Sequence, residues 1–142
     1  MKKSLFILII TIFTLVSCSK SKEATIVGKW RIISATENDK DIELSSCEMY
    51  GSFEFFKNKD CIIKKAYEGQ YDECEPDVSK GTYTFKDNVL TYKEGTEFEI
   101  RSRITELTPT SLKYTRYYIR DGRYLNEIPE NEQRTNTLKR LK

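Results

Sequence analysis

Two patterns of hydrophobic and polar positions divide this chain. Positions 5–16 form an apolar run with only two polar residues, Thr11 and Thr14, and it follows Lys2 and Lys3. From Ile26 onward, short runs of alternating hydrophobic and polar residues are separated by turn-forming residues. A period of two is typical of strands that bury one face, so we expect a short leader followed by an all-β domain.

The alternating runs predict about eight strands. The segment Lys86-Asp87-Asn88, between two such runs, is the strongest hairpin signal. We interpret 68–80 as a long loop because it contains Gly69, Pro76 and five acidic residues, and 42–47 fits either a short strand or an irregular segment. The predicted strands cover 26–34, 51–56, 61–67, 81–85, 89–92, 98–104, 112–120 and 133–141.

The spacing of these runs favours an antiparallel barrel or sandwich, because no segment of the domain shows a helical period. The longest alternation assigns its two faces clearly. We expect four residues to face inward, namely Phe98, Ile100, Ser102 and Ile104. The residues expected to face outward are Glu97, Glu99, Arg101 and Arg103. They carry both signs of charge, as residues in cross-strand ion pairs do.

Composition supports the all-β interpretation. Nine Tyr, seven Phe and one Trp occur with only three Pro and six Gly, and aromatic residues are enriched in strands. The formal net charge of +2 falls to zero if residues 1–17 are removed, because this segment contains Lys2 and Lys3 and no acidic residue. A neutral domain with interspersed signs gives no electrostatic reason to expect nucleic acid as a partner.

The apolar run has the length of a signal-peptide core, about 7–15 residues, and is too short for a transmembrane helix of roughly 20. It ends in Leu15-Val16-Ser17-Cys18, which resembles the lipobox of bacterial lipoproteins. That resemblance implies a signal peptide at 1–17, acylation of Cys18, and membrane attachment through acyl chains such as palmitate. The alternative is an ordinary signal peptide whose cleavage site holds a cysteine.

A polar segment, 18–25, follows the lipobox and is suited to a flexible tether. By analogy with enteric bacteria, an acidic residue directly after Cys18 would imply retention in the inner membrane. This position is Ser19. We therefore expect a cell-envelope protein that is lipid-anchored in the outer membrane, and the sequence leaves the periplasmic or surface face open.

Gly28-Lys29-Trp30 resembles the Gly-x-Trp signature of the lipocalins. Together with the lipobox, a Phe-x-Phe strand at 53–55 and a Gly-Thr-Tyr hairpin at 81–83, it gives a layout similar to the lipocalin-like lipoproteins of Bacteroidetes. The resemblance implies that residues 26–142 form a small up-and-down antiparallel barrel. The chain departs from the kernel lipocalins in lacking their Thr-Asp-Tyr motif and a helix before the last strand.

In such folds, the tryptophan closes the floor of the barrel beneath an arginine from a late strand. The resemblance therefore assigns Gly28 and Trp30 to the floor and makes Arg116 the candidate arginine. By period two, Arg116 shares a face with Leu112, Tyr114 and Tyr118. The alternative is an edge or solvent-facing arginine.

Three cysteines remain besides Cys18, and an exported protein permits disulfides. The residues alone leave three pairings open among Cys47, Cys61 and Cys74. The resemblance favours Cys47–Cys74, since related lipoproteins often carry a cysteine at each place. Cys61 alternates in phase with Ile63 and is expected to be a buried apolar residue. No zinc or other metal site is expected, because the chain has no histidine and its cysteine spacings match no zinc finger.

Two functional hypotheses follow. A lipocalin-like barrel can hold a small hydrophobic ligand, and the expected pocket residues are Phe53, Phe55, Tyr83, Phe85, Tyr92, Phe98, Tyr114 and Tyr118. Alternatively, the same rings fill the barrel, and the domain is a structural or interaction lipoprotein. Such a protein would contact an envelope partner through surface groups such as Tyr117, Tyr124 or the acidic segment around Cys74.

An enzyme is not expected. There is no histidine to act as a general base, no glycine-rich phosphate loop and no Gly-x-Ser-x-Gly elbow. The paired Glu97 and Glu99 lie among basic residues in a solvent-exposed pattern. Calcium at 72–77 is not expected either, because the ordered spacing of a calcium loop is missing. We predict no catalytic residues and no cofactor.

Overall fold

The computed structural model describes residues 25–69, 73–122 and 124–142. The predicted signal peptide at 1–17 and the predicted lipid attachment at Cys18 lie outside the described residues, as does the tether up to residue 24. No helix in the described parts of the chain is long and apolar enough to cross a lipid bilayer.

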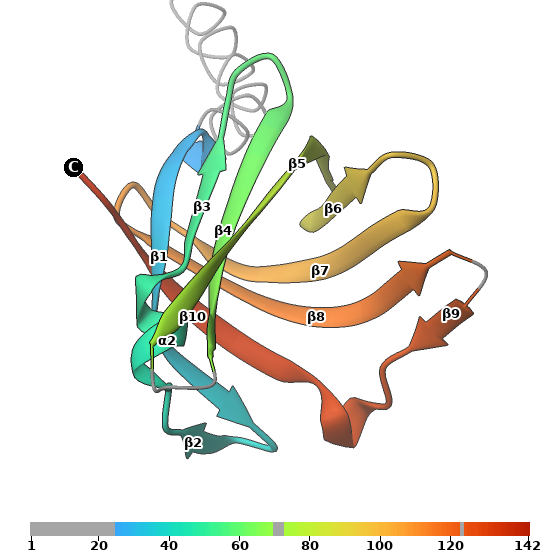
Figure 1. Cartoon of the computed structure of the whole chain (residues 1–142). Coiled ribbons are helices and arrows are strands. Elements are labelled where there is room, and N and C mark those ends of the chain that lie inside the picture. The colour runs from blue at the N-terminus through green and yellow to red at the C-terminus, as the bar shows by residue number, and fades with distance from the viewer. Residues whose placement is uncertain (1–24, 70–72, 123) are drawn as a thin grey trace, which may run out of the picture.

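The described chain is almost entirely β-structure (Figure 1). One short α-helix and one 3-10 turn interrupt the strands. The elements in chain order are β1 (Gly28–Glu37), β2 (Lys40–Ile42), α2 (Ser46–Tyr50), β3 (Ser52–Phe55), β4 (Asp60–Glu68), β5 (Cys74–Lys86), β6 (Val89–Glu94), β7 (Phe98–Leu107), β8 (Ser111–Asp121), β9 (Tyr124–Glu127), η2 (Glu130–Glu132) and β10 (Arg134–Arg140).

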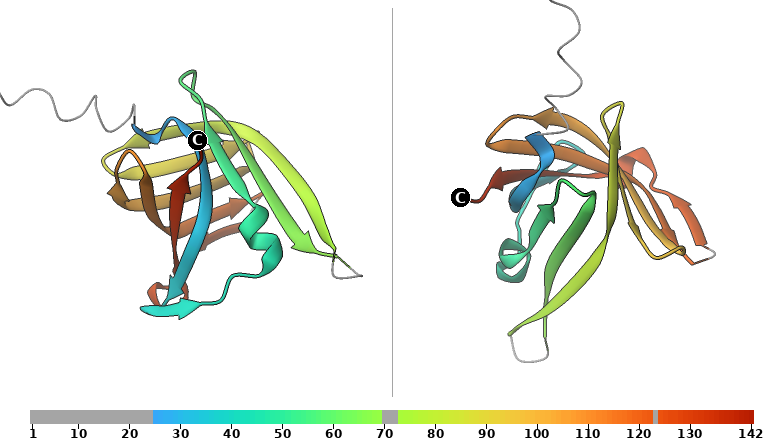
Figure 2. Two further views of the ribbon diagram at one scale, coloured as in Figure 1. Left: turned by 90° about the vertical axis from the view of Figure 1, so that its left-hand side faces the viewer. Right: turned by 90° about the horizontal axis from the view of Figure 1, so that it is seen from above.

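Eight of these strands close into an antiparallel barrel, which confirms the predicted fold class (Figure 2). The pairing runs β10-β1-β3-β4-β5-β6-β7-β8, and β8 then pairs with β10 to complete the ring. β2 and β9 are short additions that pair with β1 and β8 outside the ring. All barrel strands lie within 28–140 and enclose one continuous core, so this part of the chain folds as a unit.

Tight turns join the sequential strands. The hairpin between β5 and β6 turns at Asp87 and Asn88, whose φ angles are +52° and +60°. Asn38 and Asp39, between β1 and β2, have φ angles of +50° and +59°. Positive φ at both central residues is the geometry that matches strand twist, and Asn and Asp tolerate it best after Gly. The predicted hairpin at 86–88 is therefore confirmed.

The interpretation of 68–80 as a loop is wrong over most of its length. β5 begins at Cys74, and its pairing with β4 runs from Glu68 opposite Cys74 to Asp60 opposite Thr82. Backbone hydrogen bonds hold this two-stranded ribbon, and most of its side chains from 74 to 80 are exposed. A strand that buries neither face shows no hydrophobic alternation, so the acidic composition concealed it.

The open segment 42–47 divides between two elements. β2 ends at Ile42, and α2 begins at Ser46 after Ser45, which caps the helix. The Ser45 side chain accepts from the Glu48 backbone N–H at 3.2 Å, and the Glu48 carboxylate accepts from the Ser45 N–H at 3.0 Å. This capping box satisfies two free N–H groups and stabilises a helix of only five residues.

Inward side chains of the barrel strands form the core, with Trp30, Tyr83, Leu112 and Leu138 fully buried. Glu99 differs from its expected solvent exposure. It lies on the outer face as predicted, but only 3% of it is exposed, since three basic side chains cover it. Its carboxylate lies 2.6 Å from Arg101 Nε, 3.4 Å from Arg120 Nη2 and 3.5 Å from Lys93 Nζ. These cations compensate the burial of its charge.

Candidate functional site

The floor of the barrel is built around Trp30. The indole is fully buried, and its Nε1 donates a hydrogen bond to the Ile26 carbonyl at 2.9 Å. Above the ring lies Arg140, with its guanidinium carbon 4.2 Å from the ring centroid. Trp30 and Arg140 are directly opposite each other in the β1–β10 ladder, so both side chains lie on the same face. Their stacking is a cation–π contact.

Arg140 also joins two separate chain segments at the floor. Its Nη1 donates to the Val27 carbonyl and its Nε to the Pro109 carbonyl, both at 2.6 Å, and Nη2 donates to the Thr25 carbonyl. Burial lowers the pKa of Arg140 from its ordinary value. These bonds tie the entrance to β1 to the turn between β7 and β8.

The glycine of the Gly-x-Trp signature has a specific role at this floor. Gly28 has a φ angle of +137°, which side-chain-bearing residues rarely adopt. A Cβ atom there would clash with Nη1 of Arg140. Because hydrogen bonds hold the guanidinium in place, it has little freedom to move away. Glycine is therefore required where the arginine crosses the backbone.

The assignment of Arg116 to the floor is wrong. The backbone N–H of Arg140 donates to the Thr110 carbonyl, so the floor meets β8 at its beginning. Arg116 lies six residues further along β8, about 20 Å away at the rise of an extended strand. It does face inward, opposite the buried Ser102. The late strand that closes against Trp30 is β10, and only the closure of the ring determines this.

The main cavity lies at the other end of the barrel, near α2. It has a volume of about 550 Å³, within the range of about 300–1,000 Å³ typical of small-molecule sites. Strands β1, β3, β4, β8 and β10 and the helix α2 supply its walls. Its lining residues are Ile32, Ser45, Glu48, Gly51, Phe53, Lys64, Lys65, Ala66, Tyr67, Glu68, Tyr114, Arg116, Arg134 and Asn136.

A second, smaller cavity of about 30 Å³ lies deeper in the barrel and is mostly apolar. It shares Phe53, Tyr114 and Arg116 with the main cavity, so these three residues form the boundary between the two. Its remaining lining residues are Phe55, Ile63, Leu90, Tyr92, Ile100, Ser102, Leu112 and Leu138. The barrel is thus filled toward the floor and open toward α2.

The predicted pocket rings are divided by this arrangement. Phe53 and Tyr114 line the main cavity, and Phe55 and Tyr92 line only the inner one. Tyr83, Phe85 and Phe98 line neither cavity and pack in the core instead. Tyr83 packs edge-on against Phe55 with ring centroids 5.0 Å apart, and its hydroxyl donates to the Phe56 carbonyl at 2.9 Å.

Tyr118 does not belong to the pocket. The β7–β8 register places Arg101 opposite Tyr118 and Ser102 opposite Arg116, so Tyr117 is an extra residue in β8. This bulge reverses the alternation. The Arg101 guanidinium consequently stacks on the Tyr118 ring at 4.5 Å, and Arg103 lies 5.5 Å from the Tyr117 ring. Both tyrosines lie on the outer face.

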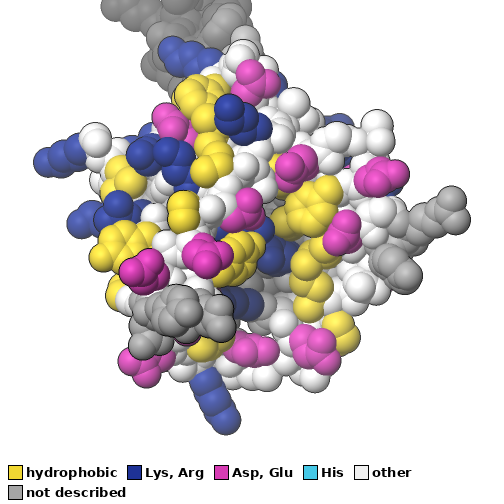
Figure 3. Space-filling view, viewed as in Figure 1, with side chains coloured by type: hydrophobic (Ala, Val, Ile, Leu, Met, Phe, Trp, Pro, Cys, Tyr) yellow, Lys and Arg dark blue, Asp and Glu magenta, His cyan; other side chains and the backbone are white. Residues whose placement is uncertain are grey.

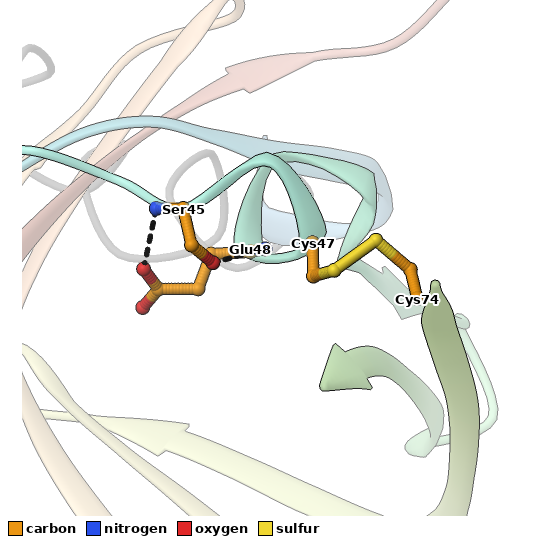
Figure 4. Close-up of a disulfide and its surroundings, with 4 residues drawn as sticks. All are labelled: Ser45, Cys47, Glu48 and Cys74. Carbon is orange, nitrogen blue, oxygen red and sulfur yellow. Dashed lines mark hydrogen bonds between the residues drawn. A yellow bond between two sulfur atoms is a disulfide. The ribbon is translucent and has the colours of Figure 1, made fainter. Parts of the chain in front are cut away.

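Two contacts hold helix α2 beside the main cavity. Figure 4 shows the first of them, the disulfide. Cys47, which is buried, forms a disulfide with Cys74 at the start of β5. The Glu48 carboxylate lies 2.8 Å from Nη1 of Arg134 on β10. The disulfide is the pairing that the resemblance implied, and the remaining described cysteine, Cys61, is a buried free thiol as expected.

The cavity holds more charge than the predicted aromatic pocket. Period two places Lys65 in line with the inward Cys61 and Ile63, and Arg134 in line with the inward Asn136 and Leu138. Alternation had signalled these positions, but basic side chains are usually assigned to solvent. Glu48 was missed because α2 was not predicted, although Ser45 and Glu48 have the spacing of a capping box.

Ionisation in the cavity is set by these neighbours. Burial alone would raise the pKa of Glu48, but the Ser45 backbone N–H and the Arg134 guanidinium outweigh it and lower the pKa. Burial raises the pKa of Tyr114, with Arg116 and Arg134 opposing the rise. Tyr114 is therefore a neutral phenol at neutral pH, and Glu48 is an anion. Among the described residues, no group of Cys, Asp and Glu is arranged to hold a metal ion.

Acidic and basic side chains are intermixed on the face in Figure 3. This distribution agrees with the balanced charge expected for residues 18–142.

Comparisons with known proteins address the fold. The family model described as "Lipocalin-like domain" matches residues 26–114. An uncharacterized protein from Bacteroides eggerthii has a crystal structure similar to this chain, with a TM-score of 0.53 and 14% identity over 81% of this chain and 98% of that one. Bovine odorant binding protein, as a deswapped triple mutant, gives a TM-score of 0.41 and 15% identity over 81% and 71%. No match is found among curated proteins.

Proposed function

The chain belongs to the lipocalin-like domain family, and on that premise we propose that it binds a small, largely hydrophobic molecule in the cavity beside α2. The observation that carries this proposal is the cavity of about 550 Å³ at one end of an otherwise filled barrel. An open cavity of this size at the end of the barrel is typical of small-molecule sites.

The walls of the cavity favour an organic ligand. Ile32, Phe53 and Tyr114 offer apolar surface from three different strands. Phe53 and Tyr114 pack edge to face with ring centroids 6.2 Å apart, which fixes both rings before a ligand arrives. A preformed pocket spends little binding energy on ordering its own side chains.

We further propose that the chain acts at the cell envelope as a lipoprotein and not as an enzyme. Support comes from the leader and lipobox ending at Cys18. The full chain and a Cys18→Ala variant, expressed in bacteria fed radiolabelled palmitate, test the anchor. We expect the full chain to incorporate the label and to appear in the membrane fraction. The variant should remain unlabelled. Equal labelling of both would overturn the lipid attachment.

Native mass spectrometry tests ligand binding directly. Residues 19–142, secreted into an oxidising periplasm, retain every described element of the barrel. A discrete small-molecule adduct under native conditions, lost on denaturation, is the expected result. If the native and denatured masses are equal after exposure to a cell extract, the barrel holds no ligand. A lipoprotein that binds an envelope partner then becomes the better proposal.

A matched pair of variants ties any adduct to the cavity. Ile32→Phe adds volume inside the cavity, whereas Ile33→Phe makes the same change at an adjacent position that is 53% exposed. We expect Ile32→Phe to reduce occupancy and Ile33→Phe to leave it unchanged. If Ile32→Phe leaves the occupancy of the adduct unchanged, the adduct binds elsewhere on the protein.

A further inference from the structure

The basic side chains inside the barrel are concentrated at one end. Lys65 on β4, Arg116 on β8 and Arg134 on β10 occupy inward positions of three different strands, and all three line the main cavity. Below them, the inward positions carry almost exclusively apolar or aromatic side chains. A lysine or arginine at an inward position is uncommon unless it has an anionic partner.

The described residues supply only one close anionic partner for these three cations. Glu48 lies 2.8 Å from Arg134, and Arg134 also donates to the Asn136 side chain at 3.0 Å. Neither Lys65 nor Arg116 forms an ion pair within the described chain. The other acidic residue of the cavity, Glu68, is exposed at its rim.

Of the three cations, Arg116 is the one with an unfilled hydrogen-bonding position. Its Nε atom is buried and has no hydrogen-bond partner among the described residues. It has no part in closing the floor, because Arg140 covers Trp30. A buried N–H of a charged group without an acceptor is costly, and such a group persists where a ligand supplies the acceptor.

The position of Arg116 defines the kind of molecule that would satisfy it. Together with Phe53 and Tyr114, it forms the boundary between the outer cavity, which holds the charged side chains, and the mostly apolar inner one. A ligand at this boundary meets a guanidinium fork beside two aromatic rings. A guanidinium pairs with oxyanions such as carboxylate and phosphate through two parallel hydrogen bonds.

We propose that the cavity selects an organic anion, with its acidic group against Arg116 and its apolar body against Phe53 and Tyr114. This inference rests on the proposed ligand-binding function and narrows its ligand class. Lys65 adds positive charge from the opposite wall. Arg134 is largely neutralised by Glu48 and contributes less.

Two fluorescent probes of nearly the same shape test the charge requirement. 1-Anilinonaphthalene-8-sulfonate carries a sulfonate, and N-phenyl-1-naphthylamine is the neutral counterpart without it. We use residues 19–142 in detergent-free buffer. We expect the sulfonate probe to bind at least about tenfold more tightly than the neutral probe, because the neutral probe cannot form the charge-assisted hydrogen bonds with Arg116. This comparison requires only the wild-type protein.

Two matched substitutions locate the effect. Arg116→Met keeps a long side chain but removes the charge, and it should abolish the preference for the sulfonate probe while leaving the neutral probe bound. Arg103→Met makes the same change on the outer face, where Arg103 is exposed and lies beside Tyr117, and should leave the preference intact. Circular dichroism and thermal melting establish that each variant is folded.

The possible outcomes separate the two proposals. Equal affinity for both probes in the wild type, or a preference that survives Arg116→Met, overturns the anion proposal and leaves the hydrophobic site standing. A preference abolished by Arg103→Met points to surface binding and also overturns it. If neither probe binds the wild type, both the proposed function and this inference fail.

Discussion

Arg140→Met is the sharpest test of how this barrel is closed. The substitution retains an unbranched side chain over Trp30 but removes the guanidinium. Three carbonyls, those of Thr25, Val27 and Pro109, then lose their donors at once. Because these carbonyls belong to two separate segments, their connection across the floor is lost as well.

The magnitude follows from the contacts. Two of the three hydrogen bonds are partly buried, and each bond to a charged group contributes about 1.5 kcal/mol at the low end of its range. The stacking on Trp30 adds about 0.5–1 kcal/mol. Methionine regains a little of this by packing on the ring. We expect Arg140→Met to lower the free energy of unfolding by about 3 kcal/mol.

Equilibrium unfolding in guanidinium chloride measures this loss. Trp30 is the single tryptophan of the chain, so its fluorescence reports directly on the floor. With a slope of roughly 4 kcal/mol per molar for a domain of this size, the midpoint should fall by roughly 0.7 M.

Gly28→Ala should also destabilise the protein, by about 1–3 kcal/mol, since it forces alanine to a positive φ angle beneath the guanidinium.

Arg116→Met is the matched control. It removes another inward arginine of the barrel, whose buried Nε has no partner among the described residues, so stability should change by less than about 1 kcal/mol or increase. The reasoning is refuted if Arg140→Met shifts the midpoint no more than Arg116→Met. It is equally refuted if Arg116→Met proves the more damaging of the two.

Three further results are expected. Replacing both Cys47 and Cys74 by alanine should lower the unfolding free energy by about 3.5 kcal/mol in the chain-entropy model for a separation of 27 residues, and a loss below 1 kcal/mol in denaturant titrations would contradict that constraint. Burial raises the pKa of the Cys61 thiol to about 12, so in residues 19–142 at pH 8 iodoacetamide should alkylate it only after unfolding, as seen by intact mass. Burial raises the pKa of Glu99 but its basic neighbours outweigh this and lower it, so its stabilisation is complete above the ordinary carboxyl pKa and is lost as pH falls through the lowered value. Glu99→Gln should therefore cost about 1–2 kcal/mol at pH 7, and the difference between the melting curves of the variant and the wild type should shrink as the pH falls below the ordinary carboxyl pKa. A difference that stays constant with pH would count against the charge cluster.

Local periodicity determined most of the fold in advance. The alternation around Phe55 and Tyr83 correctly assigned these rings to the interior, because the face of a residue within one strand depends only on its parity. The hairpin at 86–88 could be predicted as well, since its turn needs residues that tolerate positive φ angles. Together they were enough to predict an antiparallel barrel of about eight strands.

Where parity is broken, the sequence misled. The bulge at Tyr117 moved Tyr118 from the predicted pocket to the outer face. Burial of Glu99 came from cations on β6, β7 and β8 that approach one another only in the sheet. The ribbon beginning at Cys74 has no buried face, so hydrophobic alternation had no means of revealing it.

The sequence by itself predicted most of the barrel strands, because each depends on local alternation. Its resemblance to the lipocalins placed Gly28 and Trp30 at the floor, where both act within one strand. The tertiary structure decided which arginine covers that floor and where the cavity lies. Those outcomes depend on which strands meet when the ring closes, and closure joins segments more than 100 residues apart, such as Val27 and Arg140. Arg116 and Arg140 are both arginines of late strands, and only the register of β10 against β1 assigns one to the floor and the other to the cavity.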